Sequence, residues 1–460
     1  HINYASCTNS RHNAFVDTLN AVPPITIGLQ NAGDSHSRRV RIVVILGGLA
    51  SILFGLPWVA FFAIRGEWMG ASADCAVILG GVFAIRMARL GRLRGAAILL
   101  VASLFTRLFA LTLFIDVPNA QVPRSLDHFL IPLAVAAYLM LKHENVWLRH
   151  GLAWGCLASV IFFSSSRVGV ATRLVITIPN SVRGPATWVT NSAAMLLLFL
   201  LLQIFVADID RLEALLHRAR VRTVALAHLA TPSQFNDSLT RLDESIASTL
   251  PQNASQISEA QTQAWQRTQA GRTRLTVLAS SGLLIAFGSV FGVYFILQGI
   301  WPMELFDGAF VALGLSLWML TRHQHQRAAT IGLVVGMMLI FGVIPVILDI
   351  PTLNVPRAMH YWFLPLSLGA YFLLRDENAW IHNGLPIACL VAFVVLGSSN
   401  WGFVTNFIVP DSDRPAPWLS CTCALGVLYF LVYILVGDIK RLEDRLGHAV
   451  RHLFGHNRAG

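Results

Sequence analysis

The sequence predicts an all-α polytopic membrane protein made of two parallel six-helix repeats, with about 12 transmembrane helices and both termini in the cytoplasm. Two observations lead to this prediction. The 460-residue chain is 55% hydrophobic and only 13% charged, whereas soluble domains carry about 25% charged residues. Too few polar groups are therefore present to cover a water-exposed surface. In addition, residues 122–151 recur as residues 355–384.

The internal repeat keeps a constant offset of 233 residues. Identical pairs within it include Pro123/Pro356, Arg124/Arg357, Pro132/Pro365, Tyr138/Tyr371 and Trp147/Trp380. Outside this stretch the same offset relates Asp74 to Asp307, Asp116 to Asp349 and Cys156 to Cys389. An ungapped offset over roughly 125 residues indicates a membrane module that was duplicated head to tail. We place module 1 at residues 41–207 and module 2 at residues 274–437.

The spanning segments follow from length and apolarity, because a helix needs about 20 apolar residues to cross a hydrocarbon core of about 30 Å. In the first half, they lie at residues 41–64, 71–88, 95–115, 126–142, 151–166 and 186–207. In the second half, they lie at residues 274–298, 304–321, 328–349, 359–375, 384–400 and 417–437. The fourth and fifth segments of each half are short and meet at a tight polar turn.

Polar sequence flanks the two modules. Residues 1–40 are predicted to form a polar N-terminal arm, residues 208–273 a cytoplasmic helical linker, and residues 438–460 a cytoplasmic C-terminal helix. Each module runs out through the pattern Asp-Ile-x-Arg-Leu-Glu, at residues 208–213 and 438–443. This pattern fits a signalling helix that couples the bundle to a further partner. It fits equally well a basic amphipathic helix that lies on the anionic inner leaflet.

The basic residues set the expected orientation, because cytoplasmic loops retain Lys and Arg. Most basic loops fall on one side if the N-terminus is cytoplasmic. Residues 166–187 disagree, since Arg167, Arg173 and Arg183 would then face outward. The net charge of +10 is explained by these loops, and we expect no nucleic acid as a partner. The expected location is a bacterial inner membrane.

Ionisable residues recur near the predicted outer face of both modules. The candidate ligand-binding residues are Asp74, Asp116, Arg124, His128, Asp307, Asp349, Arg357 and His360. Charges at this depth are usually paired. They fit structural Arg–Asp pairs that tie helices two, three and four together, or a shallow outward pocket for a small polar headgroup. The two histidines would add pH sensitivity to such a pocket. Pro132 and Pro365, in the fourth helix of each module, are candidate hinges because proline permits a kink.

Other chemistry is not indicated by the sequence. Residues 142–147 and 375–380 form an inner turn in which Glu and Asn can cap the next helix; the alternative is a contact surface for a cytoplasmic partner. No nucleotide loop, metal-ligand spacing or nucleophile elbow is present. We therefore expect no enzyme, no cofactor and no metal site.

The pattern V-P-R-x-x-H-x-x-x-L-P-L-x-x-x-A-Y-x-x-L-R-D-E, preceded by three helices with a basic loop, resembles the six-helix membrane modules of bacterial signalling proteins. These modules anchor some adenylate and diguanylate cyclases and certain quorum-sensing receptor kinases. The best-matching residues are Arg357, His360, Pro365, Leu366, Tyr371, Asp376 and Glu377. Asp127 departs from the pattern at the position that matches His360. No output domain follows either module, so the resemblance implies sensing or anchoring without enzymatic activity.

Two functions remain open at this stage, besides a purely scaffolding duplicate. The first is a membrane sensor or anchor that couples an outer-face or lipid ligand to its exit helices, and through them to a signalling partner or a second copy. The alternative is a secondary transporter with the six-plus-six layout of major-facilitator carriers. Carriers place ionisable groups at mid-depth, where this chain has only Arg107, and Arg107 is replaced by Ile340 in the second half. The sensor is therefore preferred.

Overall fold

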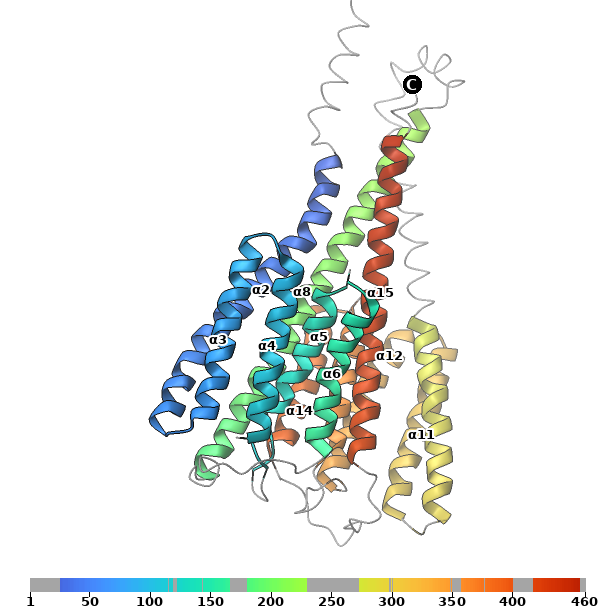
Figure 1. Ribbon diagram of the computed structural model, residues 1–460. Coiled ribbons are helices and arrows are strands. Elements are labelled where there is room, and N and C mark those ends of the chain that lie inside the picture. Colours follow the sequence, from blue (N-terminus) through green and yellow to red (C-terminus); the bar gives the residue numbers. More distant parts are fainter. Residues whose placement is uncertain are drawn as a thin grey trace, which may run out of the picture.

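The described part of the chain is helical throughout and contains no strand (Figure 1). The computed structural model describes residues 25–114, 116–118, 122–142, 144–165, 180–229, 273–297, 299, 301–347, 349, 357–375, 377–399 and 417–455. In the first half, the elements are α2 (Ile25–Ile64), α3 (Trp68–Arg89), α4 (Leu93–Phe114), the 3-10 helix η1 (Leu126–Phe129), α5 (Leu130–Met140), α6 (Val146–Ser165) and α8 (Asn180–Leu229).

The second half repeats the element bounds of the first. It contains a helix at Thr273–Leu297, then α11 (Trp301–Arg322), α12 (Gln326–Ile347), η2 (Met359–Trp362), α13 (Phe363–Leu373), α14 (Ala379–Ser398) and α15 (Pro417–Gly455). The bounds of α11, α12, η2, α13 and α14 are those of α3, α4, η1, α5 and α6 moved by 233 residues. The offset found in the sequence therefore also relates the helix ends.

Ten of the described helices are long and apolar enough to cross a membrane, as expected of an integral membrane protein. Large apolar side chains face outward along them, for example Leu46, Leu49 and Leu53 on α2. An apolar exterior of this kind matches a lipid environment, where it costs nothing to leave such side chains unburied.

The fourth segment of each half differs from the prediction. A continuous spanning helix was expected at residues 126–142 and 359–375, but each segment is a 3-10 turn followed by a helix of 11 residues. Such a helix is only about 16 Å long, well short of a hydrocarbon core of about 30 Å. Every residue of α5 is buried. Protein therefore surrounds this short helix, and its apolar composition serves the core and not a lipid contact.

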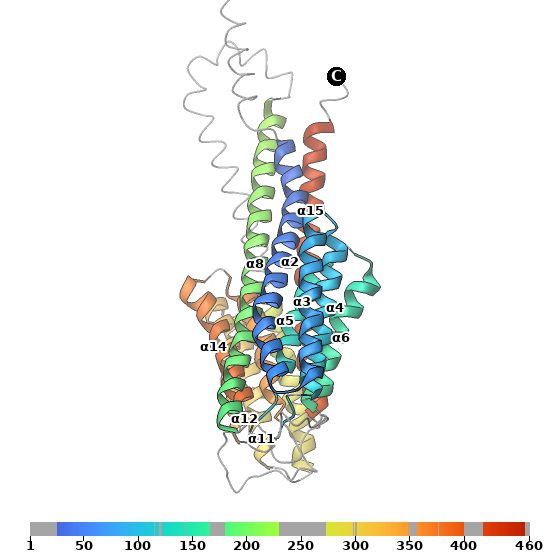
Figure 2. The ribbon, with the colours of Figure 1, turned by 60° about the vertical axis from the view of Figure 1, so that its left-hand side comes forward.

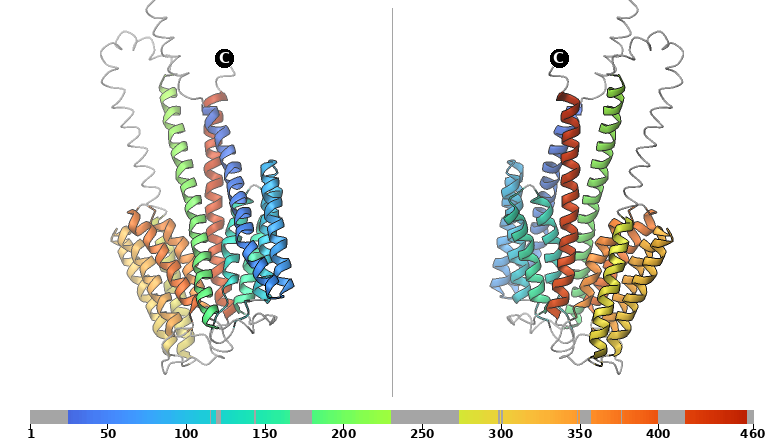
Figure 3. Two further views of the ribbon diagram at one scale, coloured as in Figure 1. Left: turned by 90° about the vertical axis from the view of Figure 1, so that its left-hand side faces the viewer. Right: turned by 90° about the vertical axis from the view of Figure 1, so that its right-hand side faces the viewer.

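The two halves share one core around α8 and α15. The hairpins of α2, α3 and α4 lie on one side, and Thr273–Leu297, α11 and α12 lie on the other (Figure 3). α8 packs against α14 of the second half, and α15 packs against α6 of the first half. The main hydrophobic cluster contains residues of both halves, including Leu130, Phe363 and Phe393. This reciprocal packing makes the halves a single structural unit.

Three long helices extend beyond the bundle at the same end: the start of α2 and the ends of α8 and α15 (Figure 2). α2 begins at Ile25, so residues 25–40 of the expected polar arm are helical, and residues 1–24 lie outside the described residues. The expected linker begins as the end of α8, which reaches Leu229, while residues 230–272 lie outside the description. Exposed Arg89, Arg92 and Arg94 lie at the loop between α3 and α4 at this end.

Candidate functional site

Arg124 clamps the outer ends of two helices in the first half. Its Nε donates to the carbonyl oxygen of Asp116 at 3.0 Å, and its Nη1 donates to the carbonyl oxygen of Phe163 at 2.6 Å. The Asp116 carboxylate accepts the backbone N–H groups of Ser125 and Leu126, both at 2.6 Å. It thereby caps η1. Burial raises the pKa of Asp116, and these two backbone hydrogen bonds oppose that rise.

Arg357 makes the same clamp in the second half. It donates to the carbonyl oxygens of Asp349 at 3.0 Å, Leu396 at 2.7 Å and Ser399 at 3.0 Å. The Asp349 carboxylate accepts from the N–H groups of Ala358 and Met359, at 2.8 and 2.7 Å. Burial lowers the pKa of Arg357, and the nearby Asp349 carboxylate opposes this shift. These contacts give four predicted site residues a structural task, whereas ligand binding by them stays a prediction.

Asp74 and Asp307 occupy equivalent positions but have different surroundings. Asp74, on α3, is fully buried and forms an ion pair with Arg107 of α4 at 2.5 Å. Ile340 replaces that arginine in the second half. Within the described residues, Oδ2 of the buried Asp307 has no hydrogen-bond partner. The predicted outer charges thus form a pair in one half only.

A chain of polar side chains connects the two halves at the outer end of the core. Ser164 of α6 donates to Oδ2 of Asp127 at 2.8 Å and also contacts the hydroxyl of Tyr361. That hydroxyl lies 2.9 Å from Nε2 of His128. Nδ1 of His128 lies 2.5 Å from Oδ1 of Asn191 on α8. Finally, Nδ2 of Asn191 donates to Ser398 of α14 at 2.7 Å.

This polar chain, made of Asp127, Ser164, Tyr361, His128, Asn191 and Ser398, is almost entirely shielded from solvent. Ser164 is half-buried, and the other five side chains are at most 5% exposed. Buried polar groups need partners, so the chain acts as a specific fastener between halves that otherwise meet through apolar side chains. His128 and Tyr361 occupy equivalent positions in the two halves and face each other.

His360, the counterpart of Asp127, lies beside this chain and not within it. Its ring centroid is 6.0 Å from that of His128 and 5.0 Å from that of Phe393. Both ring nitrogens are buried and lack hydrogen-bond partners among the described residues. The predicted pair of histidines is therefore brought together, but in the interior and not in a water-filled outer pocket.

The candidate hinges lie at the start of the short central helices. Pro132 is the third residue of α5, and Pro365 is the third residue of α13. Each follows directly on a 3-10 turn. The missing N–H thus falls in the first turn, where a helix has unpaired N–H groups in any case. Bending at these prolines stays a prediction.

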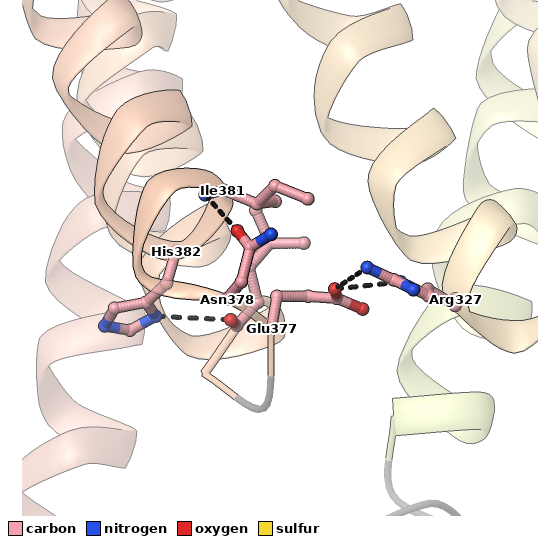
Figure 4. A network of polar contacts seen from close by, with 6 residues as sticks. Arg327, Glu377, Asn378, Ile381 and His382 are labelled. Carbon is pink, nitrogen blue, oxygen red and sulfur yellow. Dashed lines mark hydrogen bonds and ion pairs between the residues drawn. The ribbon is translucent and has the colours of Figure 1, made fainter.

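The inner turns are held by ion pairs and caps that repeat in both halves. Arg327 pairs with Glu377 at 2.8 Å, and the Asn378 side chain accepts the N–H of Ile381 to cap α14 (Figure 4). In the first half, Arg94 pairs with Glu144 at 2.9 Å. Helix capping, as predicted, is thus present in the second half. A role of these turns as a partner surface stays a prediction.

The exit helices α8 and α15 contact each other beyond these turns. Ile209, Leu212 and Leu216 of α8 pack against Leu435 and Ile439 of α15, and we call this contact the exit seam. In the repeated pattern Asp-Ile-x-Arg-Leu-Glu, Ile209 and Ile439 are equivalent. Nearby, Arg375 forms an ion pair with Glu213 of α8 at 2.8 Å, which ties the turn after α13 to the exit helix of the first half.

Sequence reasoning missed Ser164, Asn191 and Tyr361 as members of the polar chain, since each is one polar residue in an apolar segment. A usable signal was present in the offset itself. Residues that face each other across an axis relating two repeats stand at equal positions, as His128 and Tyr361 do. Comparison of the whole chain with family models, curated proteins and solved structures found no match.

Proposed function

We propose that this protein is a tandem membrane sensor or anchor, whose duplicated six-helix halves couple an outer-face or lipid ligand to the cytoplasmic exit helices and a separate partner. One observation carries the proposal: both exit helices begin at the polar chain and continue, without a break, to the exit seam. In this reading, 12 segments enter the bilayer, two of them as short buried helices, and both termini are cytoplasmic.

The coupling path in the first half runs along α8. Asn191 belongs to the buried polar chain, and Ile209 of the same helix belongs to the exit seam. The distance between them is about 27 Å along an α-helix. A continuous helix transmits a shift or rotation over that length, because its hydrogen bonds leave little internal freedom.

The second half offers a comparable path along α15. Trp362 of η2 donates to the Ser420 hydroxyl at 3.3 Å, and Ile439 on the same helix reaches the exit seam. The seam positions on α8 are spaced by three and four residues, as in a parallel two-helix coiled coil. Such a coil has two neighbouring arrangements that differ by small rotations, which suits an output element.

Spin labels on the exit helices test this coupling. We place one label on exposed Ala214 of α8 and one on exposed Asp444 of α15, in the full chain in lipid nanodiscs, and measure their distance distribution. We expect Asn191→Leu, which cuts the polar chain, to change the distribution. Thr190→Val, on the same helix with only an intrahelical side-chain hydrogen bond, is the matched control. An unchanged distribution in Asn191→Leu would refute coupling.

A secondary transporter is the second candidate, and the position of the polar chain between the two halves favours it, because carriers bind substrates at the interface of their repeats. Proteoliposomes containing a pH-sensitive dye distinguish the two functions. We expect no proton flux above that of protein-free vesicles. A flux that disappears in Arg107→Ile would replace the sensor by the transporter.

A further inference from the structure

The hydrogen bonds of the polar chain constrain where its protons are. Ser164 donates its single hydroxyl proton to Asp127. The contact between Ser164 and Tyr361 must then use the Tyr361 proton. The Tyr361 oxygen is left to accept from Nε2 of His128, at 2.9 Å. Read in this direction, every contact has one donor and one acceptor.

The other nitrogen of His128 also carries a proton. It faces Oδ1 of Asn191, and an amide oxygen can only accept. The Asn191 amide nitrogen is occupied by Ser398, which fixes the orientation of the amide. Both ring nitrogens of His128 thus donate, so the ring is an imidazolium, and Asp127 at the other end is a carboxylate.

A second proton arrangement uses the same heavy atoms. If Nε2 gives its proton to Tyr361, Tyr361 gives its own to Ser164, and Ser164 gives its own to Asp127, both ends become neutral. Each of the three O–H or N–H bonds that breaks is matched by one that forms, and the contact with Asn191 is unchanged. The two arrangements therefore differ only in the end at which one proton resides.

We propose that Asp127 and His128 bind one proton jointly, as a buried proton-binding site that Tyr361 of the other half completes. This inference rests on the proposed function only where it names the proton as the stimulus. Release of that proton leaves a carboxylate facing a neutral imidazole, whose Nδ1 can no longer donate if Nε2 does. The Asn191 amide must then turn over and change its bond to Ser398, which alters the link between α8 and α14.

The surroundings of His128 contain few other groups that could take the proton. The titratable or charged side chains facing it from the packed elements are Asp127, His360, Tyr361, Cys421, Arg124 and Arg357. On α6 and α8, the chain is lined by a hydroxyl and an amide. The nearest competitor is His360, whose nitrogens have no acceptor among the described residues and which would be charged beside a second imidazolium.

The second half lacks the parts for an equivalent site. Gly397 stands where the first half has Ser164, and an added Cβ there would lie 3.1 Å from Cδ2 of His360. Cys421 stands where the first half has Asn191, and His360 replaces the acid. One site per chain is therefore built, with the acid and base from one half and the relay from the other.

Titration of the two end groups tests the shared proton. In the full chain in nanodiscs, the Asp127 carboxyl is followed by infrared spectroscopy with ¹³C-labelled aspartate, and His128 by ¹⁵N NMR. Difference spectra against Asp127→Asn and His128→Gln assign the signals. We expect both groups to change over the same pH interval, because coupled groups titrate as a pair. Tyr361→Phe removes only the relaying hydroxyl and should separate the two transitions by about one pH unit or more.

Tyr371→Phe is the matched control, since Tyr371 is a buried tyrosine of the same half whose ring stacks on His382, away from the polar chain. Independent transitions in the unmodified protein, no transition of either group, or coupled transitions that persist in Tyr361→Phe would each overturn the proposal. These results do not depend on the spin-label distances. A shared proton with unresponsive exit helices would refute the sensor and leave the proton site standing.

Discussion

Replacing Arg357 by alanine is the sharpest test of whether the outer arginines are structural. The side chain is 6% exposed and donates to three backbone carbonyl oxygens. A hydrogen bond from a charged group contributes about 1.5–3 kcal/mol, but the three bonds share one side chain and do not add. We therefore expect a loss of about 3–5 kcal/mol, the range for breaking a buried charged contact.

The assay is reversible unfolding of the full chain in mixed micelles, with the free energy of unfolding measured against denaturing detergent. Arg124→Ala should cost a similar amount, because Arg124 makes the equivalent clamp. Arg357→Lys should fall between alanine and arginine, since lysine keeps the charge but loses the planar fork. The control is Arg327→Ala, whose side chain is 68% exposed in its ion pair with Glu377 and should cost at most about 1 kcal/mol.

The reasoning fails if Arg357→Ala costs no more than Arg327→Ala, or if Arg124→Ala and Arg357→Ala differ several-fold. Either result would mean that the carbonyl contacts are incidental. The two arginines would then be free to serve the ligand pocket that their recurrence near the outer face also allows.

Three further predictions use the same unfolding assay. Arg107→Ile should destabilise the chain by about 3–5 kcal/mol, because it leaves the fully buried carboxylate of Asp74 without its partner; adding Asp74→Asn should recover part of the loss, and no recovery would contradict this account. Leu212→Ala should cost about 2–5 kcal/mol by emptying the exit seam, and a loss below about 1 kcal/mol would mean that the seam does not hold the exit helices together. Gly397→Ala should cost about 1–3 kcal/mol, since its methyl would lie 3.1 Å from a buried histidine ring, while Gly384→Ala, with open space around it, should cost nothing or stabilise α14.

The helices that contact lipid were predicted well from sequence, because their length and apolarity are set by the bilayer. The segment predicted at residues 95–115 is α4 at Leu93–Phe114, and the segment predicted at 71–88 is α3 at Trp68–Arg89. Residues 126–142 failed because hydropathy alone does not distinguish a helix facing lipid from one enclosed by protein. The site was predicted in part for a related reason. Recurrence identified the clamping arginines, whereas contacts between unlike residues of the two halves left no repeated pattern.

The two halves agree where they build the scaffold and differ where they meet. The clamps of Arg124 and Arg357, the helix bounds and the inner ion pairs all follow one offset. Along the contact between the halves, equivalent positions carry different chemistry, with Asp127 opposite His360 in the alignment and His128 opposite Tyr361. A symmetric pair of modules would place like groups against each other and could not orient a proton along a chain. Divergence at these positions gives the bundle a direction, which both a sensor and a proton site require.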